Sequence, residues 1–128
     1  MNKKEINYSL VKLDQAFKKL KAGASQAADE LAEDGVIQRF EFTCQLLWKT
    51  IKVFLKNSGV IAMTPREVLQ EAFRLEWFTD EKVFLNMLED RNKTSHIYDQ
   101  KTSREVFERI KNDYIPAIER VLLKLSSM

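Results

Sequence analysis

Apolar residues recur along the chain at steps of three and four, the spacing that places them on one face of an α-helix. The first stripe predicts a helix from about Lys3 to Lys21 and consists of Ile6, Leu10, Leu13, Phe17 and Leu20. A longer stripe follows Gly35 and consists of Ile37, Phe40, Cys44, Leu47, Trp48, Ile51 and Phe54 or Leu55. Asn57-Ser58-Gly59 predicts the end of this second helix. Residues 22–33, rich in Ala, Asp and Glu, predict a linker that holds a short helical turn at most.

Capping motifs predict where the remaining helices begin. Thr64-Pro65-Arg66-Glu67 combines a capping hydroxyl, a proline at the first helical position and a glutamate that can reach back to the cap. Thr79-Asp80-Glu81 predicts a fourth helix. Thr102-Ser103-Arg104-Glu105 resembles a capping box and predicts a last helix that extends to Leu125. Pro116 lies inside that helix and is expected to kink it, because proline has no backbone N–H.

These elements predict an all-α fold, an up-and-down bundle of four main helices plus a shorter helix, in one domain over residues 1–128. A chain of 128 residues supports one hydrophobic core. Three Gly and two Pro are too few for the many tight turns of an all-β sandwich or barrel. No apolar run approaches the roughly 20 residues that cross a bilayer, and no apolar leader follows Met1. We therefore expect a cytoplasmic protein that does not associate with membranes.

Charge and the scarcity of metal-binding side chains limit the chemistry further. The 21 basic and 19 acidic residues give a net charge of +2, which leaves room for a local basic site but does not predict a surface built to coat nucleic acid. Cys44 is the only cysteine, so we expect a buried thiol rather than an internal disulfide. One His and one Cys fall short of the three or four ligands of a zinc site. We expect neither a metal nor another cofactor.

One short segment, Arg91 to Tyr98, gathers residue types that perform chemistry. His96 is the only imidazole, the side chain best suited to acid–base catalysis near neutral pH. Arg91 can hold a phosphate through two parallel hydrogen bonds. In an unbroken helix these two residues would be turned about 140° apart, so their convergence requires the chain to leave the helix within Asn92–Ser95, where weak helix formers stand. In extended backbone, His96 and Tyr98 would then point to the same side.

The residues by themselves leave simpler interpretations open. An Arg and a His near a helix end can merely complement the negative end of the helix dipole. Glu89-Asp90 beside Arg91 could be an acid–base pair or an ordinary ion pair. The basic stripe on the second helix could be a solvated face or a phosphate contact, and it consists of Lys49, Lys52 and Lys56.

Aromatic residues are predicted to belong to the core rather than to a base-stacking surface. Four of them follow helical spacing: Phe40, Trp48, Phe73 and Phe84. Trp77-Phe78 lies between two predicted helices, where we expect a packed elbow rather than a contact with a partner.

Three blocks of this sequence resemble a known family. They are Gly35-Val36-Ile37-Gln38-Arg39-Phe40-Glu41-Phe42-Thr43 through Trp48-Lys49-Thr50, Pro65 to Phe73, and Met87 to His96 followed by Tyr98-Asp99. The chain resembles the HEPN superfamily of small helical bundles, whose hallmark is Arg, four to six residues, then His. More narrowly, it is similar to the nucleotidyltransferase substrate-binding proteins, small subunits encoded beside a minimal nucleotidyltransferase. The likeness extends from Ile6 to Leu125.

The resemblance implies a site and a chemistry. Related HEPN proteins are dimers in which Arg and His of both chains line a cleft, and many cleave RNA without a metal. By position, Arg91 would grip the scissile phosphate and His96 would act as base or acid. Supporting roles would fall to Asn92, Ser95 and Asp99.

The pattern Arg-x4-His-x-Tyr implies regulation as well. It resembles toxins of toxin–antitoxin pairs, in which a nucleotidyltransferase antitoxin transfers AMP to the tyrosine. Tyr98 would be the AMP acceptor, and a minimal nucleotidyltransferase the partner. Other members of the family are known only as non-catalytic subunits that help to form the substrate site of the nucleotidyltransferase. This alternative stays open, and the chain has no Gly-Ser and paired-Asp nucleotidyltransferase signature of its own.

Physical chemistry gives a separate reason to expect a homodimer. Metal-free RNA cleavage by the 2′-hydroxyl benefits from a base and an acid, whereas one chain offers a single imidazole. A two-fold axis would supply the second imidazole and a second guanidinium.

Overall fold

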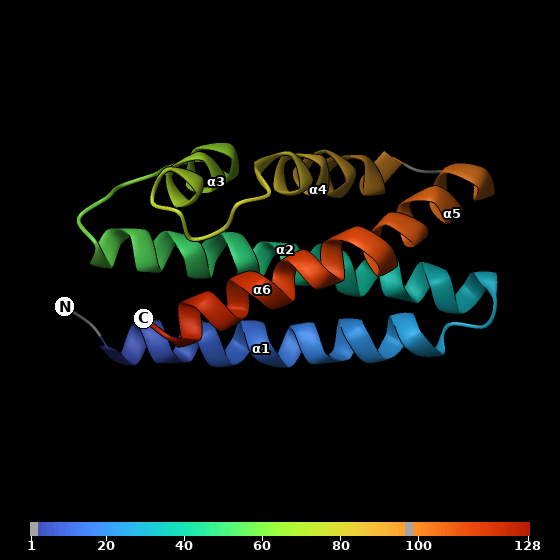
Figure 1. Cartoon of the computed structure of the whole chain (residues 1–128). Coiled ribbons are helices and arrows are strands. Elements are labelled where there is room, and N and C mark those ends of the chain that lie inside the picture. The colour runs from blue at the N-terminus through green and yellow to red at the C-terminus, as the bar shows by residue number, and fades with distance from the viewer. Residues whose placement is uncertain (1–2, 97–98) are drawn as a thin grey trace.

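The computed structural model describes residues 3–96 and 99–128, apart from the side chain of Ser95. The helices are α1 (Lys3–Gln26), α2 (Glu30–Asn57), α3 (Pro65–Arg74), α4 (Glu81–Lys93), α5 (Gln100–Arg109) and α6 (Ile115–Ser126). A 3₁₀ turn, η1 (Thr94–His96), follows α4, and a π-helical turn, η2 (Ile110–Tyr114), joins α5 to α6. No strand occurs in the described part of the chain. The predicted all-α bundle is confirmed: α5, η2 and α6 form one continuous rod, and α3 is the shorter helix (Figure 1).

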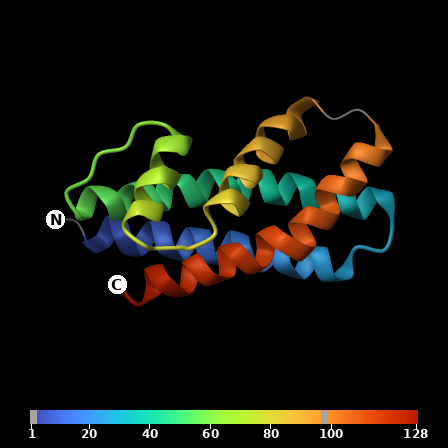
Figure 2. The ribbon, with the colours of Figure 1, turned by 45° about the horizontal axis from the view of Figure 1, so that its top comes forward.

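The long helix α2 is the centre of the bundle. It lies alongside α1 and also contacts α3, α4 and α5. Figure 1 shows α3 and α4 on one side of α2 and α1 on the other, while the α5–α6 rod crosses over α2 and continues along α1. The view in Figure 2 shows the same crossing and places both chain ends at one end of the molecule. None of the described helices has the length and apolarity needed to cross a membrane.

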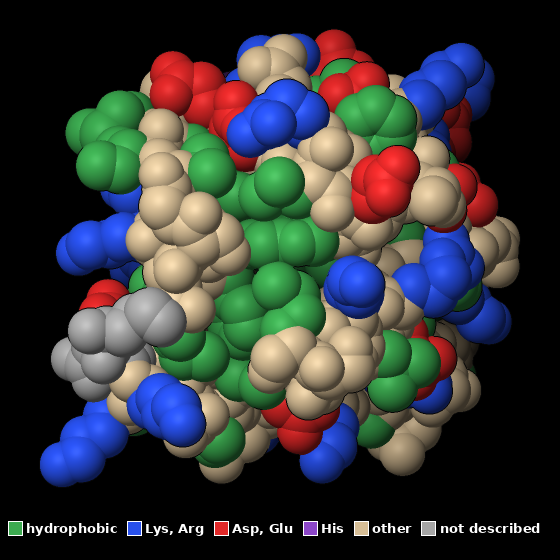
Figure 3. All heavy atoms as spheres, turned by 60° about the vertical axis from the view of Figure 1, so that its left-hand side comes forward, with side chains coloured by type: hydrophobic (Ala, Val, Ile, Leu, Met, Phe, Trp, Pro, Cys, Tyr) green, Lys and Arg blue, Asp and Glu red, His purple; other side chains and the backbone are tan. Residues whose placement is uncertain are grey.

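The core contains most of the residues that the apolar stripes predicted. The stripe of α2 is buried from Val36 to Leu55, and Cys44 is a buried thiol as expected. Trp77 and Phe78 are also buried between α3 and α4, so the predicted elbow is confirmed. Phe73 differs from the expectation, because 38% of its surface is exposed. Figure 3 faces the end of the molecule where α2 connects to α3 and shows apolar side chains gathered among Lys and Arg.

The predicted linker over residues 22–33 is wrong. Helix α1 continues to Gln26 and α2 begins at Glu30, after Asp29, whose carboxylate accepts a 2.8 Å hydrogen bond from the Ala32 N–H. Alanine is the strongest helix former, and Ala24 is buried, so propensity and packing both extend α1. The prediction for the other end of α2 is confirmed: the helix ends at Asn57, and Gly59 adopts a φ of +83°.

The last helix begins earlier than predicted, and a π-helical turn precedes its proline. Asp99, and not Thr102, is the N-cap of α5. Pro116 stands in the first turn of α6, directly after the π-helical turn, in which the Ile115 N–H donates to the Ile110 carbonyl. The wider turn precedes the proline and lets the rod continue without a break.

Candidate functional site

The segment predicted to perform chemistry lies at the end of α4. The α-helix ends at Lys93, and residues 94–96 continue as a 3₁₀ turn, in which the Thr94 hydroxyl donates a 2.7 Å hydrogen bond to the Arg91 carbonyl. The chain therefore leaves the α-helix within Asn92–Ser95 as predicted, but by tightening its winding and not by extending at His96. Tyr98 and the side chain of Ser95 lie outside the described residues.

Arg91 and His96 lie in different surroundings. Arg91 is half-buried, and among the described residues its guanidinium forms no ion pair. His96 and Asn92 are exposed. At about 100° per α-helical residue and about 120° per 3₁₀ residue, His96 leaves the local axis roughly half a turn away from Arg91. The turn alone therefore does not place the imidazole beside the guanidinium of the same chain.

The charge of Arg91 acts on the buried face of α2. Burial raises the pKa of the Cys44 thiol far above its ordinary value of 9.0, and the nearby positive charge of Arg91 partly opposes this effect. A thiol held neutral in this way is a poor nucleophile, so Cys44 belongs to the core and not to the chemistry.

A buried polar network that was not among the predicted features holds the same end of α4. The Asp90 carboxylate is almost fully buried and accepts two hydrogen bonds from Arg109, at 2.7 Å from Nε and 3.0 Å from Nη2. The Tyr114 hydroxyl donates to the same carboxylate. Burial and the hydrogen bond to Asp90 raise the pKa of Tyr114, and the carboxylate likewise raises the pKa of Arg109. Asp90 therefore does form an ion pair, but with Arg109 and not with the neighbouring Arg91 that the sequence suggested.

This network fixes the rotation of the last turn of α4. Neighbouring residues of an α-helix differ by about 100°, so a carboxylate that faces α5 and η2 directs the next side chain elsewhere. Asp90 faces the α5–α6 rod, and Arg91 lies near Cys44 of α2. A signal for the network was present in the sequence, because Asp90 follows Met87 by three residues and so continues the apolar stripe of α4.

Asp99, predicted to support the site, has a structural role in the described chain. Its carboxylate accepts hydrogen bonds from the Thr102 N–H at 2.7 Å and from the Thr102 hydroxyl at 2.9 Å. The hydrogen bond from the Thr102 N–H, the largest effect, and that from its hydroxyl lower the pKa of Asp99. Asp99 therefore starts α5 and sets the direction in which the chain leaves the 91–98 segment.

An acidic groove of about 280 Å³ adjoins η1 and the start of α5. Its lining residues are Glu30, Asp34, Ile37, Gln38, Glu41, Thr94, Asp99, Gln100 and Ser103. Four of these are carboxylates and none is a cation, so this groove repels phosphate. No group of three or more His, Cys, Asp or Glu side chains among the described residues could hold a metal ion.

Comparisons with known proteins agree with this architecture. The family described as nucleotidyltransferase substrate binding protein like matches residues 3–127. A Haemophilus influenzae protein described as probable ribonuclease HepT is 30% identical over 115 residues, which cover 77% of this chain and 79% of that protein.

Two solved structures have the same fold. A crystal structure from Thermus thermophilus matches with a TM-score of 0.83 and 30% identity, covering 88% of this chain and 98% of that one. A Haemophilus influenzae structure, described as the fold of a substrate binding domain of a nucleotidyltransferase, matches with a TM-score of 0.82 and 28% identity. That match covers 91% of this chain and 98% of the other.

Proposed function

Because the chain belongs to the nucleotidyltransferase substrate binding protein like family, we propose that it pairs with a minimal nucleotidyltransferase and cleaves RNA as a metal-independent homodimer. One observation carries the proposal. In the described chain the Arg91 guanidinium has no carboxylate partner, and His96, the only histidine, is exposed five residues further on. The 30% identity to a probable ribonuclease supports it.

In the proposed reaction the 2′-hydroxyl of RNA attacks the adjacent phosphorus. One His96 accepts the 2′-hydroxyl proton, the 2′-oxygen–phosphorus bond forms, and the bond from phosphorus to the 5′-oxygen breaks. A protonated His96 donates a proton to the leaving 5′-oxygen. Arg91 stabilises the additional negative charge on the phosphate oxygens. The products are a 2′,3′-cyclic phosphate and a 5′-hydroxyl.

Two copies of the chain are needed for this division of roles. One chain offers one imidazole, which leaves the axis of α4 roughly half a turn away from Arg91 of the same chain. A two-fold axis beside η1 would bring His96 of one copy towards the Arg91 of the other and supply both base and acid.

Tyr98 is the proposed point of regulation. The partner nucleotidyltransferase would transfer AMP from ATP to the tyrosine oxygen, with release of pyrophosphate. An adenylyl group two residues from His96 adds bulk and a negative charge where RNA phosphate would have to enter. Intact-mass spectrometry of the chain after incubation with the partner and ATP tests this step, and a Tyr98→Phe chain should gain no mass.

The test of the nuclease uses purified full-length protein, a mixed-sequence RNA and a chelator of divalent ions. Cleavage products with 2′,3′-cyclic phosphate ends are expected, and His96→Ala should lower the rate by about 10²–10⁴-fold. Lys101→Ala, which removes an exposed cation close by, is the matched control and should keep the activity. Cleavage that persists in the His96→Ala protein would rule the proposed mechanism out.

The structural match to a protein described as the substrate binding domain of a nucleotidyltransferase favours a second candidate function. In it the chain is a non-catalytic subunit that completes the substrate site of its partner. Co-purification with the nucleotidyltransferase, together with no RNA cleavage and no growth arrest on expression of this chain alone, would select this function.

A further inference from the structure

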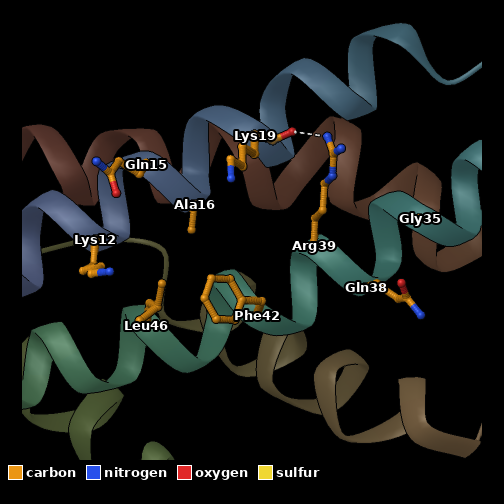
Figure 4. Close-up of a pocket in the computed structure, with 9 residues that line it drawn as sticks. All are labelled: Lys12, Gln15, Ala16, Lys19, Gly35, Gln38, Arg39, Phe42 and Leu46. Atoms are coloured by element: carbon orange, nitrogen blue, oxygen red, sulfur yellow. Dashed lines mark hydrogen bonds between the residues drawn. The ribbon is translucent and has the colours of Figure 1, made fainter.

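A second groove differs in charge from the acidic one beside η1. It lies between α1 and α2 and has a volume of about 620 Å³ (Figure 4). Lys12 and Lys19 line it from α1 and Arg39 from α2, and no carboxylate is among its lining residues. Gln38 lines both grooves, so the two grooves are neighbours on α2.

Arg39 is held in place at the edge of this groove. Its Nη1 donates a 2.9 Å hydrogen bond to the Lys19 carbonyl, drawn as the dashed line in Figure 4. Gly23 makes this approach possible, because a Cβ there would lie 2.8 Å from Arg39 Nη1. The bond uses one of five guanidinium donors, and Arg39 is exposed. A pre-oriented cation with free donors is suited to a phosphate group.

The groove also presents an aromatic ring to solvent. Phe42 stands in the middle of α2 and is 57% exposed, although most apolar side chains of this helix are buried. Figure 4 shows its ring between Arg39 and Leu46, beneath α1. Cations that track a phosphate backbone, next to an aromatic ring on which a base stacks, are the elements of a site for single-stranded nucleic acid.

We propose that the α1–α2 groove binds single-stranded RNA, with phosphates at Lys12, Lys19 and Arg39 and a base stacked on Phe42. The identity of the ligand rests on the proposed nuclease function. The four carboxylates beside η1 disfavour phosphate there, so a substrate strand needs a cationic surface outside the acidic groove. This groove offers one next to it.

Gly35 allows a test that leaves the fold intact. It lines the groove, and a Cβ added to it would meet nothing within 4 Å. Gly35→Glu places a carboxylate in the groove, whereas Gly35→Gln adds a side chain of the same size without charge. Both are made in the His96→Ala chain, and binding of a fluorescent single-stranded RNA of about 10 nucleotides is measured by anisotropy.

We expect Gly35→Glu to weaken binding about tenfold relative to Gly35→Gln. Arg39→Gln should lower the slope of log K against log salt by about 1. Phe42→Ala should weaken binding about 5- to 150-fold, the range for one stacked base. Lys124→Gln, an exposed cation on α6, serves as the control for charge in general and should change each quantity least.

Three outcomes would overturn the groove proposal. Equal affinities of the Gly35→Glu and Gly35→Gln chains would show that RNA binds elsewhere. If the chain with His96 unchanged still cleaves RNA, the proposed function would stand without this groove. Conversion of a dimer to a monomer by Phe42→Ala, measured by sedimentation, would assign the groove to a subunit interface. If the unmodified chain neither cleaves nor binds RNA, the proposed function fails and this inference fails with it.

Discussion

Asp90 and Arg91 are neighbours on α4 with opposite charges and opposite environments. Asp90 is 4% exposed and bound by Arg109 and Tyr114. Arg91 is half-buried and, in the described chain, has no carboxylate partner. The 100° step of the helix separates the two side chains, so one position can be committed to stability while the next stays available for a ligand.

The largest effect on stability is expected from Asp90→Ala. It leaves Arg109 and the buried Tyr114 hydroxyl without their shared acceptor. Removing one partner of a fully buried ion pair costs about 3–5 kcal/mol, and because 37% of the Arg109 side chain is exposed, we expect a loss of about 2–4 kcal/mol. Urea unfolding measures the loss. Glu89→Ala, at the exposed neighbouring position, should stay within about 0.5 kcal/mol of the unmodified chain. Similar losses for both variants would contradict the assigned role of Asp90.

Arg91→Gln should have the opposite pattern, with a large effect on catalysis and a small effect on stability. The rate of RNA cleavage should fall about 10²–10³-fold, because a charge that stabilises the transition state is lost. The free energy of unfolding should change by less than about 1 kcal/mol, since Arg91 forms no ion pair within residues 3–96 and 99–128. Lys93→Gln removes a nearby exposed cation and should preserve the rate. An Arg91→Gln protein that unfolds easily and cleaves RNA normally would contradict the catalytic role assigned to Arg91.

Tyr114→Phe should have a smaller effect, which tests whether the Asp90 network also positions Arg91. It removes one hydrogen bond to Asp90 and should cost about 1–2 kcal/mol. Thr50→Val is the matched control, because it removes another buried hydroxyl, bonded at 3.2 Å to the Ser9 carbonyl on the far side of α2. If the network positions Arg91, only Tyr114→Phe should also slow RNA cleavage. Equal rates for the two variants would limit Tyr114 to a structural role.

Alkaline pH should produce the mildest effect. The folded chain raises the pKa of Cys44 above 9.0 and that of Tyr114 above 10.0, so the unfolded chain loses these protons first. Stability is therefore full below pH 9 and declines as the pH rises, beginning with Cys44. Urea unfolding between pH 8 and pH 10.5 measures the slope. Cys44→Ala should flatten the part that begins near pH 9, and an unchanged slope would speak against a buried neutral thiol.

Much of the fold was predictable because burial follows local periodicity. The stripes of α1 and α2 and the Thr64 cap are confirmed, and Thr64 Oγ1 accepts its hydrogen bond from the Glu67 N–H at 3.2 Å. The prediction of a linker over residues 22–33 was wrong because alanine-rich segments become helical when they pack against a core. The predicted start of α5 was wrong because two possible capping residues, Asp99 and Thr102, stand three residues apart. The sequence alone does not determine which of them caps the helix.

The residues of the candidate site stay a prediction, and their surroundings could not be predicted from the sequence. Residue type and spacing drew attention to Arg91 and His96 but left a simple helix-dipole role open, and the family resemblance favoured a site. The end of the α-helix between the two residues followed from the weak helix formers. The acidic and basic grooves combine side chains from α1, α2 and the α4–α5 connection, and local patterns do not contain such combinations.

The sequence by itself determined the helices, the buried faces and the segment that holds the only histidine, because helix period and capping act over a few residues. Only the tertiary structure decided that Asp90 binds Arg109 and Tyr114, 19 and 24 residues away, and that the charge of Arg91 reaches the Cys44 thiol of α2. Partners so distant meet through the packing of whole helices, and packing depends on all of their faces together.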